Sequence, residues 1–442
     1  MPQAYWVEHA WLPDGCRAGV RLVVANGRFT SVEVGPAEPG DEMLHGVALP
    51  GLANGHSHAF HRALRGRTHS GGGSFWTWRD QMYAVARRLD PDRYLALARA
   101  TFAEMVLAGW TAVGEFHYLH HGPDGRPYAD PNAMGAALVQ AAAEAGIRLT
   151  VLDVCYLSGG LGPDGHLPLD EVQRRFSDGS VDGWAERVAD FAPRGDVVVG
   201  AAAHSVRAVS PRALTELAAV RTDGPLHVHL SEQLAENAAA LACYGATPTR
   251  LLADAGLLGP QTTAVHATHP TDGDVTLLGD ATVTACFCPT TERDLADGLG
   301  PASALARAGS PVSLGSDSHA VVDPFEELRG LELNERLSSG RRGCFTPAEL
   351  VTAGSANGYA SLGRDGDGRL AVGASADFVV VRGDSVRTVG AEPEQIIFAA
   401  TGADVDRVVV AGETVVRDGR HRLGDPARLL AAALGDLWEE RC

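Results

Sequence analysis

The sequence predicts an α/β protein, a (β/α)8 TIM barrel with a small flanking β-sandwich domain that is built from both chain termini. Three observations lead to this prediction. Over residues 51–364, apolar runs flanked by glycine alternate with amphipathic segments rich in Ala, Leu and Arg, the pattern of repeated strand and helix units around a parallel sheet. Eight strand-like runs can be counted, and eight units close a barrel. Both chain ends instead carry short alternating strands with tight turns.

The eight strand-like runs are separated by stretches with helical periodicity, such as RYLALARATFAEMVLAG and PNAMGAALVQAAAEAG. In order, the runs are VALPGLANGH, TAVGEFHY, RLTVLDVCYL, DVVVGAAAHS, PLHVHLSE, TTAVHATH, TVTACFCP and SPVSLGSDS. In such a barrel the functional groups lie at the carboxyl ends of the strands. The polar residues that end each run are therefore the candidates for a site.

We predict three segments along the chain. Residues 1–48 supply the first strands of the small β domain, and residues 49–366 form the barrel, which we expect to depend on a metal ion. Residues 367–442 complete the β domain and end in a tail helix. The runs GVRLVVANGRFTSVEV and VDRVVVAGETVVRDGRH, with their NG and DG turns, are typical of such short strands.

The charge of the chain limits its partners. A formal net charge of −18 argues against binding to nucleic acid or to an anionic membrane, because both require a basic surface. A small anionic substrate is compatible, since charges are screened over about 10 Å at 0.1 M salt and a few arginines reverse the potential inside a pocket. The N-terminal sequence lacks the pattern of a secretion signal and no run approaches a membrane span. We therefore expect a cytoplasmic protein.

Four residues at the predicted strand ends form a candidate metal site. His56 and His58, in the stretch GHSHAFH, share one face of a strand end because side chains two residues apart point the same way. An HxH pair alone is equally compatible with a polar strand end. His229 and Asp317, at the ends of later strands, complete a set of imidazole and carboxylate ligands with a position open for water.

The run PLHVHLSE contains a second HxH pair, His227 and His229, and spacing alone does not choose between them. We assign the ligand to His229, which is nearer the carboxyl end, and expect His227 one layer deeper as a hydrogen-bonded interior group. Glu232 follows at the start of the next loop, where it can transfer protons. The alternative for Glu232 is a carboxylate at a helix N-terminus.

As a group, these motifs resemble those of a known family. The segments PGLANGHSHAFHRAL, SFWTWRDQMY, GEFHYLHH, AAHSVRAVS, HVHLSEQ, VHATH, CPTTERDLADG and GSDSH are similar to the amidohydrolase superfamily and, within it, to the formimidoylglutamate deiminases. The superfamily pattern covers nearly the whole chain. The narrower match depends on FWTWRDQMY, FHYLHH, HSVRAV and TTERDLADG.

The resemblance implies hydrolysis of N-formimidoyl-L-glutamate to N-formyl-L-glutamate and ammonia, a step of histidine degradation, at one divalent metal ion, most often Zn²⁺. It implies a homodimer. The implied metal ligands are His56, His58, His229 and Asp317; the implied catalytic residues are Glu232, His266 and Asp317; and the implied substrate contacts are Arg79, Tyr118, His204 and Arg207. Asp317 would take a proton from water, Glu232 would pass protons to the imine nitrogen, and His266 would stabilise the tetrahedral intermediate.

Two other functions are compatible with the same residues. One is a deaminase of another amidine-like substrate, such as a purine or pterin, and the other is a catalytically silent barrel that acts as a scaffold. The two carboxylates of formimidoylglutamate call for arginine, whose planar fork binds them bidentately. Arg79 and Arg207 are the candidates, with structural salt bridges as the alternative role.

In the stretch GHSHAFH, His61 departs from the family, in which this position is usually Gln. We include His61 among the substrate-binding residues, where a neutral imidazole can replace one amide hydrogen bond but not both. It can also pair with a carboxylate when charged, or pack without polar contact. The loop Arg65–Ser74, which follows this motif and contains three consecutive glycines, is expected to be mobile.

Overall fold

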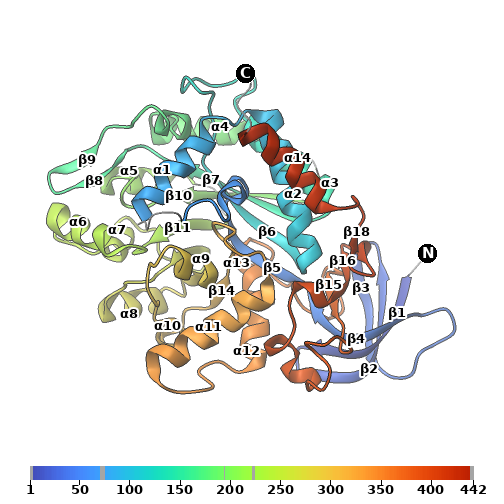
Figure 1. Ribbon diagram of the computed structural model, residues 1–442. Coiled ribbons are helices and arrows are strands. Elements are labelled where there is room, and N and C mark those ends of the chain that lie inside the picture. The colour runs from blue at the N-terminus through green and yellow to red at the C-terminus, as the bar shows by residue number, and fades with distance from the viewer. Residues whose placement is uncertain (1–2, 70–74, 194, 222–223, 439–442) are drawn as a thin grey trace.

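The computed structural model describes residues 3–69, 75–193, 195–221 and 224–438 (Figure 1). It confirms the predicted architecture, because a barrel sheet surrounded by helices is joined to a second sheet that both chain ends supply. The glycine-rich part of the loop Arg65–Ser74, residues 70–74, lies outside the described residues. The prediction of its mobility therefore stays a prediction.

Eight parallel strands form the barrel sheet, and each of them overlaps one of the predicted runs. They are β5 (Leu52–Ser57), β6 (Trp110–His117), β7 (Arg148–Cys155), β10 (Val197–Ala203), β11 (Leu226–Leu230), β12 (Thr262–His266), β13 (Thr284–Phe287) and β14 (Val312–Leu314). Each strand pairs with the next in this order. The first and last strands meet at a bridge between Ser57 and Asp317, so the site residues at these two strand ends become neighbours.

The first predicted run spans two strands. Its residues up to Pro50 belong to β4 (Glu42–Pro50), which pairs in the flanking sheet, and the barrel strand β5 begins after Gly51. A Cβ atom on Gly51 would lie 2.7 Å from both the Asp377 Cβ and the Thr111 Oγ1. Glycine is required here because the backbone passes between the two sheets with no room for a side chain.

The helices cover the outside of the barrel (Figure 1). The limits of α2 (Pro91–Ala108) show how the sequence sets them: the Asp90 side chain accepts a hydrogen bond from the Arg93 N–H, and Gly109 ends the helix at φ +114°. The other helices are α1 (Phe75–Ala86), α3 (Ala133–Ala145), α4 (Val181–Ala189), α5 (Pro211–Val220), α6 (Leu234–Tyr244), α7 (Pro248–Asp254), α8 (Asp272–Asp280), α9 (Pro289–Asp294), α10 (Ala302–Ala308), α11 (Pro324–Ser339), α12 (Pro347–Thr352), α13 (Gly358–Ser361) and α14 (Pro426–Trp438).

The loop after β7 contains structure that the sequence patterns did not predict. A short hairpin, β8 (Gly160–Gly162) and β9 (Gly165–Leu167), is followed by the 3-10 turn η2 (Gln173–Phe176). A second 3-10 turn, η1 (Ala59–Leu64), follows β5 directly. Both turns lie at the end of the barrel where the strands terminate, so they contribute walls to the site.

The flanking sheet has eight strands in the order β18-β17-β16-β15-β4-β1-β2-β3. Their bounds are β1 (Gln3–Leu12), β2 (Gly15–Ala25), β3 (Arg28–Val34), β4 (Glu42–Pro50), β15 (Phe378–Val381), β16 (Val405–Val410), β17 (Glu413–Arg417) and β18 (Arg420–His421). The N-terminal and C-terminal parts join where β15 pairs antiparallel with β4. Alternate residues of these strands, including Tyr5, Leu22 and Phe378, pack into a core separate from that of the barrel.

A buried carboxylate links the two sheets. Asp377 accepts hydrogen bonds from Arg148 of β7 at 2.6 and 3.2 Å, from the Tyr359 hydroxyl at 2.7 Å and from the Ala411 N–H at 2.6 Å. The tail helix α14 packs against α2 on the outside of the barrel (Figure 1). The domain boundaries at residues 48/49 and 366/367 stay a prediction.

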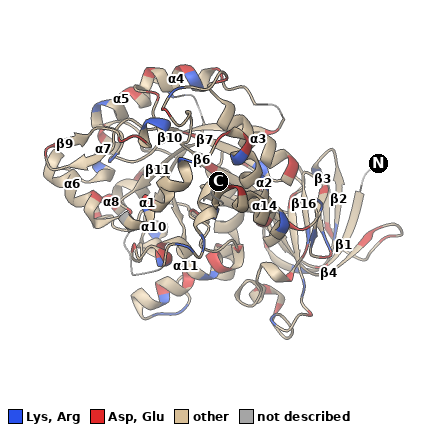
Figure 2. Ribbon diagram, turned by 45° about the horizontal axis from the view of Figure 1, so that its top comes forward, with Lys and Arg blue, Asp and Glu red and all other residues tan. Residues whose placement is uncertain are grey.

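Acidic and basic positions are interspersed over the outer helices in Figure 2. The expectation that nucleic acid is not a partner stays a prediction. Within the described ranges, each helix is too short or too polar to cross a membrane.

Candidate active site

Four side chains place their donor atoms around one point at the carboxyl end of the barrel. The His56 Nε2 lies 3.1 Å from the His58 Nε2 and 3.1 Å from the His229 Nε2. The Asp317 Oδ1 lies 3.3 Å from the His56 Nε2 and 3.2 Å from the His58 Nε2. Donor atoms at these separations can share one ion at bond lengths of about 2.0–2.2 Å. The three imidazoles and the carboxylate therefore fit a divalent metal ion.

Backbone carbonyls orient two of the imidazoles. The His58 Nδ1–H donates to the Phe116 carbonyl at 3.1 Å, and the His229 Nδ1–H donates to the His204 carbonyl at 3.0 Å. These bonds fix the tautomer that leaves each Nε2 lone pair free to bind an ion, the arrangement found around metal-binding histidines. Phe116 belongs to β6, and His204 directly follows β10. Neighbouring strands therefore orient the ligands of β5 and β11.

The site favours neutral imidazoles and an ionised carboxylate. Burial lowers the pKa of His56 to about 3 and holds the pKa of His229 well below its ordinary value. Burial alone would raise the pKa of Asp317, but its contacts with His56 and His58 hold it well below the usual range. Neutral imidazole and ionised carboxylate are the forms that bind a metal ion.

Several residues at these strand ends have a left-handed backbone that is unusual outside glycine. The φ angles are +41° at Asp317, +58° at His319, +69° at His266 and +50° at Ser231. Non-glycine residues in this region cost free energy and gather at functional sites, where the surrounding structure holds them. His266 ends β12, Ser231 directly follows β11, and Asp317 and His319 lie in the turn after β14, so the strained residues lie at the ends of the strands that supply the site.

A second group of charges lies beside the four donor atoms. The His266 Nε2 is 3.8 Å from the Glu232 Oε1 and 3.9 Å from the Asp317 Oδ2, and the His266 Nδ1 is 3.6 Å from the Glu292 Oε1. Burial opposes protonation of His266, but Glu232, Glu292 and Asp317 together raise its pKa to about 10. His266 is therefore a buried cation that can donate a hydrogen bond next to the four donor atoms.

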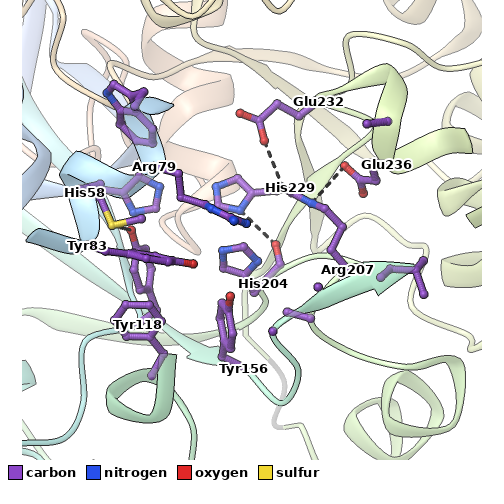
Figure 3. Close-up of a pocket in the computed structure, with 18 of the residues that line it drawn as sticks. His58, Arg79, Tyr83, Tyr118, Tyr156, His204, Arg207, His229, Glu232 and Glu236 are labelled. Atoms are coloured by element: carbon purple, nitrogen blue, oxygen red, sulfur yellow. Dashed lines mark hydrogen bonds and ion pairs between the residues drawn. The ribbon is translucent and has the colours of Figure 1, made fainter. Parts of the chain in front are cut away.

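Three of the four donor residues, His58, His229 and Asp317, line a cavity of about 250 Å³. Figure 3 shows His58 and His229 at this cavity. Its walls come from η1, α1, the hairpin after β7, η2 and the first turn of α6. Every predicted substrate contact lines this cavity: His61, Arg79, Tyr118, His204 and Arg207. Tyr83, Tyr156, Phe176, Leu161 and Leu167 line it as well and were not predicted.

Arg207 lies between two carboxylates in this cavity (Figure 3). Its Nη2 donates to the Glu232 Oε2 at 3.2 Å, and its Nε is 3.6 Å from the Glu236 Oε2. The sequence reasoning did not include Glu236. Helical spacing gave no signal for it, because Glu232 precedes α6, which begins at Leu234. Burial raises the pKa of Glu236 to about 7, and Arg207 opposes this rise.

Arg79 and Arg207 both act on the same imidazole. Burial lowers the pKa of His204 well below its ordinary value, and the guanidiniums of Arg207 and Arg79 lower it further. The Arg79 guanidinium also lies over the Tyr83 ring, 5.5 Å from its centre. Two guanidiniums around a neutral imidazole give this part of the cavity a positive character that suits an anionic ligand.

His61 is part of the cavity wall and is occupied by a protein partner. Its Nε2 is 2.7 Å from the Tyr118 hydroxyl, and its ring packs edge to face against Trp78, with 5.0 Å between ring centres. Burial holds the pKa of His61 well below its ordinary value, so the ring is neutral. The structure therefore favours a neutral role, in which His61 orients Tyr118, over pairing with a carboxylate.

The remaining strand-end histidines have structural partners. As predicted, His227 lies deeper than His229, and its Nε2–H donates to the Ser361 carbonyl at 2.7 Å. His117, His120 and Asp153 also lie close enough to hold an ion. However, Arg187 donates to both oxygens of Asp153, at 2.9 and 2.7 Å. The Asp153 carboxylate is already paired, so we assign His117, His120 and Asp153 to a buried ion-pair network.

Comparison with known proteins identifies the relatives of this chain. The model of the amidohydrolase family matches residues 47–415. The formimidoylglutamate deiminase of Pseudomonas aeruginosa is 37% identical, over 99% of this chain and 100% of that protein. The 8-oxoguanine deaminase of the same organism is 32% identical, over 95% of this chain and 94% of that protein.

Among solved structures, an amidohydrolase from Brucella melitensis is 36% identical to this chain and superposes with a TM-score of 0.89. The alignment covers 99% of this chain and 100% of that structure. The match of the family model extends from the last residues of β4 to β17, so it includes the barrel and part of the flanking sheet. This chain therefore belongs to the amidohydrolase family.

Proposed function

We propose that the protein is a formimidoylglutamate deiminase, which hydrolyses N-formimidoyl-L-glutamate to N-formyl-L-glutamate and ammonia in histidine degradation. The observation that carries the proposal is the pair of guanidiniums, Arg79 and Arg207, in the cavity that His58, His229 and Asp317 of the metal-donor set also line. The substrate has two carboxylates and one amidine, which match two arginines and one hydrolytic centre. The relative that is 37% identical over nearly the whole chain supports the same activity.

We assign the metal ion to His56, His58, His229 and Asp317, and Zn²⁺ is the ion that a set of three imidazoles and one carboxylate favours. When bound, the ion supplies Lewis acidity, which makes water nucleophilic at neutral pH. Asp317 has a second oxygen, Oδ2, directed towards His266 at 3.9 Å. This oxygen is the base that receives a proton as water attacks the formimidoyl carbon.

Glu232 and His266 complete the proton transfers. Attack forms a carbon–oxygen bond and leaves a tetrahedral carbon with two nitrogen substituents. Glu232 transfers two protons to the terminal nitrogen, first the one that Asp317 received from water and then the one on the new hydroxyl, so the carbon–nitrogen bond breaks and neutral ammonia leaves while the formyl group remains on the glutamate nitrogen. The His266 cation, 3.8 Å from the Glu232 Oε1, stabilises negative charge on the oxygen of the tetrahedral intermediate.

In this proposal, the substrate carboxylates bind in the part of the cavity that contains the two arginines. Arg207 and Arg79 receive them with charge-assisted hydrogen bonds, and Tyr118 and His204 donate or accept further hydrogen bonds. The net charge of the chain does not oppose this, because the local guanidiniums determine the potential within the cavity. We also propose, from the resemblance, that the protein is a cytoplasmic homodimer.

A second candidate is the deamination of a purine or pterin, because an 8-oxoguanine deaminase is among the relatives at 32% identity. The two guanidiniums argue against it, since a neutral base has no carboxylate to pair with them. Ammonia release should be measured from formimidoylglutamate, formimidoylaspartate, guanine, 8-oxoguanine and adenosine. Release from the formimidoyl amino acids supports the proposal, and release from the bases alone would overturn it.

A variant tests the mechanism itself. Glu232→Gln should keep the metal ion, because Glu232 is outside the four donors, and should lose about 10²–10⁴-fold in kcat through the missing proton transfer. Metal content by atomic emission and ammonia release by the same preparation give the two readouts. Near-normal turnover in this variant would show that another group transfers the proton, and a wild-type protein without metal would favour the silent scaffold.

A further inference from the structure

The first and last barrel strands meet at the candidate metal site, and few backbone hydrogen bonds join them. β5 and β14 stand at the two ends of the strand order of the barrel sheet, with one bridge between Ser57 and Asp317. The N–H groups of Ser316 and Asp317 donate to the His56 carbonyl at 3.1 and 3.0 Å, and the His58 N–H donates to the Asp317 carbonyl at 3.2 Å. Three of the four metal donors therefore lie on this seam.

Buried side chains form a continuous hydrogen-bonded chain across the same seam. The Asn54 Nδ2 donates to the Ser316 Oγ at 2.6 Å, and the Ser316 Oγ is 3.0 Å from the His319 Nδ1. The His319 Nε2 is 3.2 Å from the Ser57 Oγ, and the Ser57 Oγ donates to the Glu115 Oε2 at 2.6 Å. All five residues are fully buried, so water does not compete for these bonds.

The direction of every bond in this chain is determined by its two ends. Asn54 can only donate through Nδ2, so Ser316 accepts there and gives its own hydrogen to the His319 Nδ1. His319 must then carry its hydrogen on Nε2 and donate to Ser57. Ser57 passes its single hydrogen to Glu115, which as a carboxylate only accepts. The chain therefore requires an acceptor oxygen at its last position.

Glu115 also holds the backbone next to a metal donor. Its Oε1 accepts a hydrogen bond at 2.6 Å from the N–H of Ala59, the residue after His58. The Tyr94 hydroxyl lies 3.4 Å from the same oxygen. Glu115 thus contacts both sides of His58, through Ser57 before it and Ala59 after it. Glu115 does not line the cavity, so direct contact with a substrate is not its role.

We propose that Glu115 is a positioning residue for metal retention: it anchors the buried chain that holds the His56–His58 segment against Asp317 across the barrel seam. The inference rests on the metal site of the proposed function and does not depend on which substrate is hydrolysed. Without a carboxylate at this position, only one of the bonds from Ser57 and Ala59 can remain, because glutamine offers one acceptor oxygen. The three donors on the seam would then lose their fixed separations.

The test compares Glu115→Gln with a matched control, Glu335→Gln. Glu335 has the same kind of partners, a backbone N–H and a hydroxyl of Ser303 at 2.8 Å each, and lies on α11 outside the cavity. Both variants replace one buried carboxyl group with a carboxamide. The apparent dissociation constant for Zn²⁺ is measured by competition with a chelator, and thermal unfolding of the metal-free protein is recorded alongside.

We expect Glu115→Gln to bind Zn²⁺ about 10–100-fold more weakly than the wild type, as for other groups that orient metal ligands, while Glu335→Gln binds normally. Ser57→Ala, which breaks the chain but leaves the bond from Ala59, provides a second variant if Glu115→Gln does not fold, and should weaken binding in the same direction. The ¹⁵N shifts of His319 should report an Nε2–H tautomer in the wild type only.

Each alternative result can be distinguished. Wild-type Zn²⁺ affinity in both Glu115→Gln and Ser57→Ala would overturn the inference. An equal loss of affinity in Glu335→Gln would also overturn it, because the effect would then follow from any such loss of a buried carboxyl group. A wild-type protein that binds no metal would overturn the proposed metal site itself, which is the failure of the proposed function and not of Glu115 alone.

Discussion

Replacing Arg207 with methionine should reduce the use of dicarboxylate substrates. The Arg207 side chain is 13% exposed, and its guanidinium is the group that pairs with Glu232 and Glu236. Methionine keeps an unbranched apolar stem of similar reach without the charge. A hydrogen bond to a charged group contributes about 1.5–3 kcal/mol. Since about 1.4 kcal/mol is a factor of ten, kcat/KM for formimidoylglutamate should fall about 10- to 150-fold.

The loss of Arg207 also leaves two buried carboxylates without this cation, so the substrate effect must be separated from the effect on Glu232. Two shortened substrates do this: a formimidoyl amino acid without the side-chain carboxylate, and formimidoyl-γ-aminobutyrate, which lacks the α-carboxylate. If Arg207 binds one of these groups, the variant should lose less activity on the substrate that lacks that group. Ammonia release at several substrate concentrations gives kcat and KM for each combination.

Arg79→Met is the matched control, because Arg79 lies in the same cavity and should select the other carboxylate. Metal content and circular dichroism of both variants should equal those of the wild type. An equal loss of kcat/KM on all three substrates would refute the reasoning, because it would mean that Arg207 acts only through its carboxylate neighbours. The pair of arginines would then no longer explain the substrate.

Three other changes give separate expectations. His61→Gln should change kcat/KM by less than about tenfold, because a carboxamide can still hydrogen-bond the Tyr118 hydroxyl; a larger loss in the ammonia assay would show that the imidazole itself is needed. Arg187→Met should lower the free energy of unfolding by about 3–5 kcal/mol in urea titrations, since it leaves two buried carboxylates without their cation; a loss below about 1 kcal/mol would contradict this. Burial opposes ionisation of Asp404, but Arg387 and other hydrogen bonds lower its pKa from 3.8 to about 2. This depressed pKa stabilises the fold above about pH 4 and ceases to do so as the pH falls towards 2. Wild type and Asp404→Asn should therefore differ by about 1 kcal/mol at pH 7, reduced by solvent around the 41% exposed Arg387, and converge in thermal melts near pH 2–3; a constant difference would exclude the ion pair.

The strand ends of the barrel were the most predictable part of the site. His56 and His58 lie two residues apart in β5, and this period alone aims them at one point. His229 was chosen over His227 because of its place in the strand, and His227 indeed donates to a backbone carbonyl in the interior. These features depend on local periodicity and on the common direction of parallel strands, which are both visible in the sequence.

Residues on helices and loops after the strands were less predictable. Glu236 and Glu292 reach the site from α6 and α9, and their approach depends on how each helix is rotated against the barrel. Tyr156 and the hairpin after β7 enter the cavity wall from a loop whose path has no periodic pattern. The break at Gly51 falls inside one predicted strand run, because one continuous apolar stretch serves two sheets.

By itself, the sequence determined the number and order of the barrel strands, the division between barrel and flanking strands in outline, and the types of donor available at the strand ends. Only the tertiary structure decided which donors share one point, which charged groups surround His266 and Arg207, and that His61 is paired with Tyr118. The physical reason is closure of the barrel. Contacts between residues such as Ser57 and His319 form only when the first and last strands meet, and no local pattern encodes a contact across so long a separation along the chain.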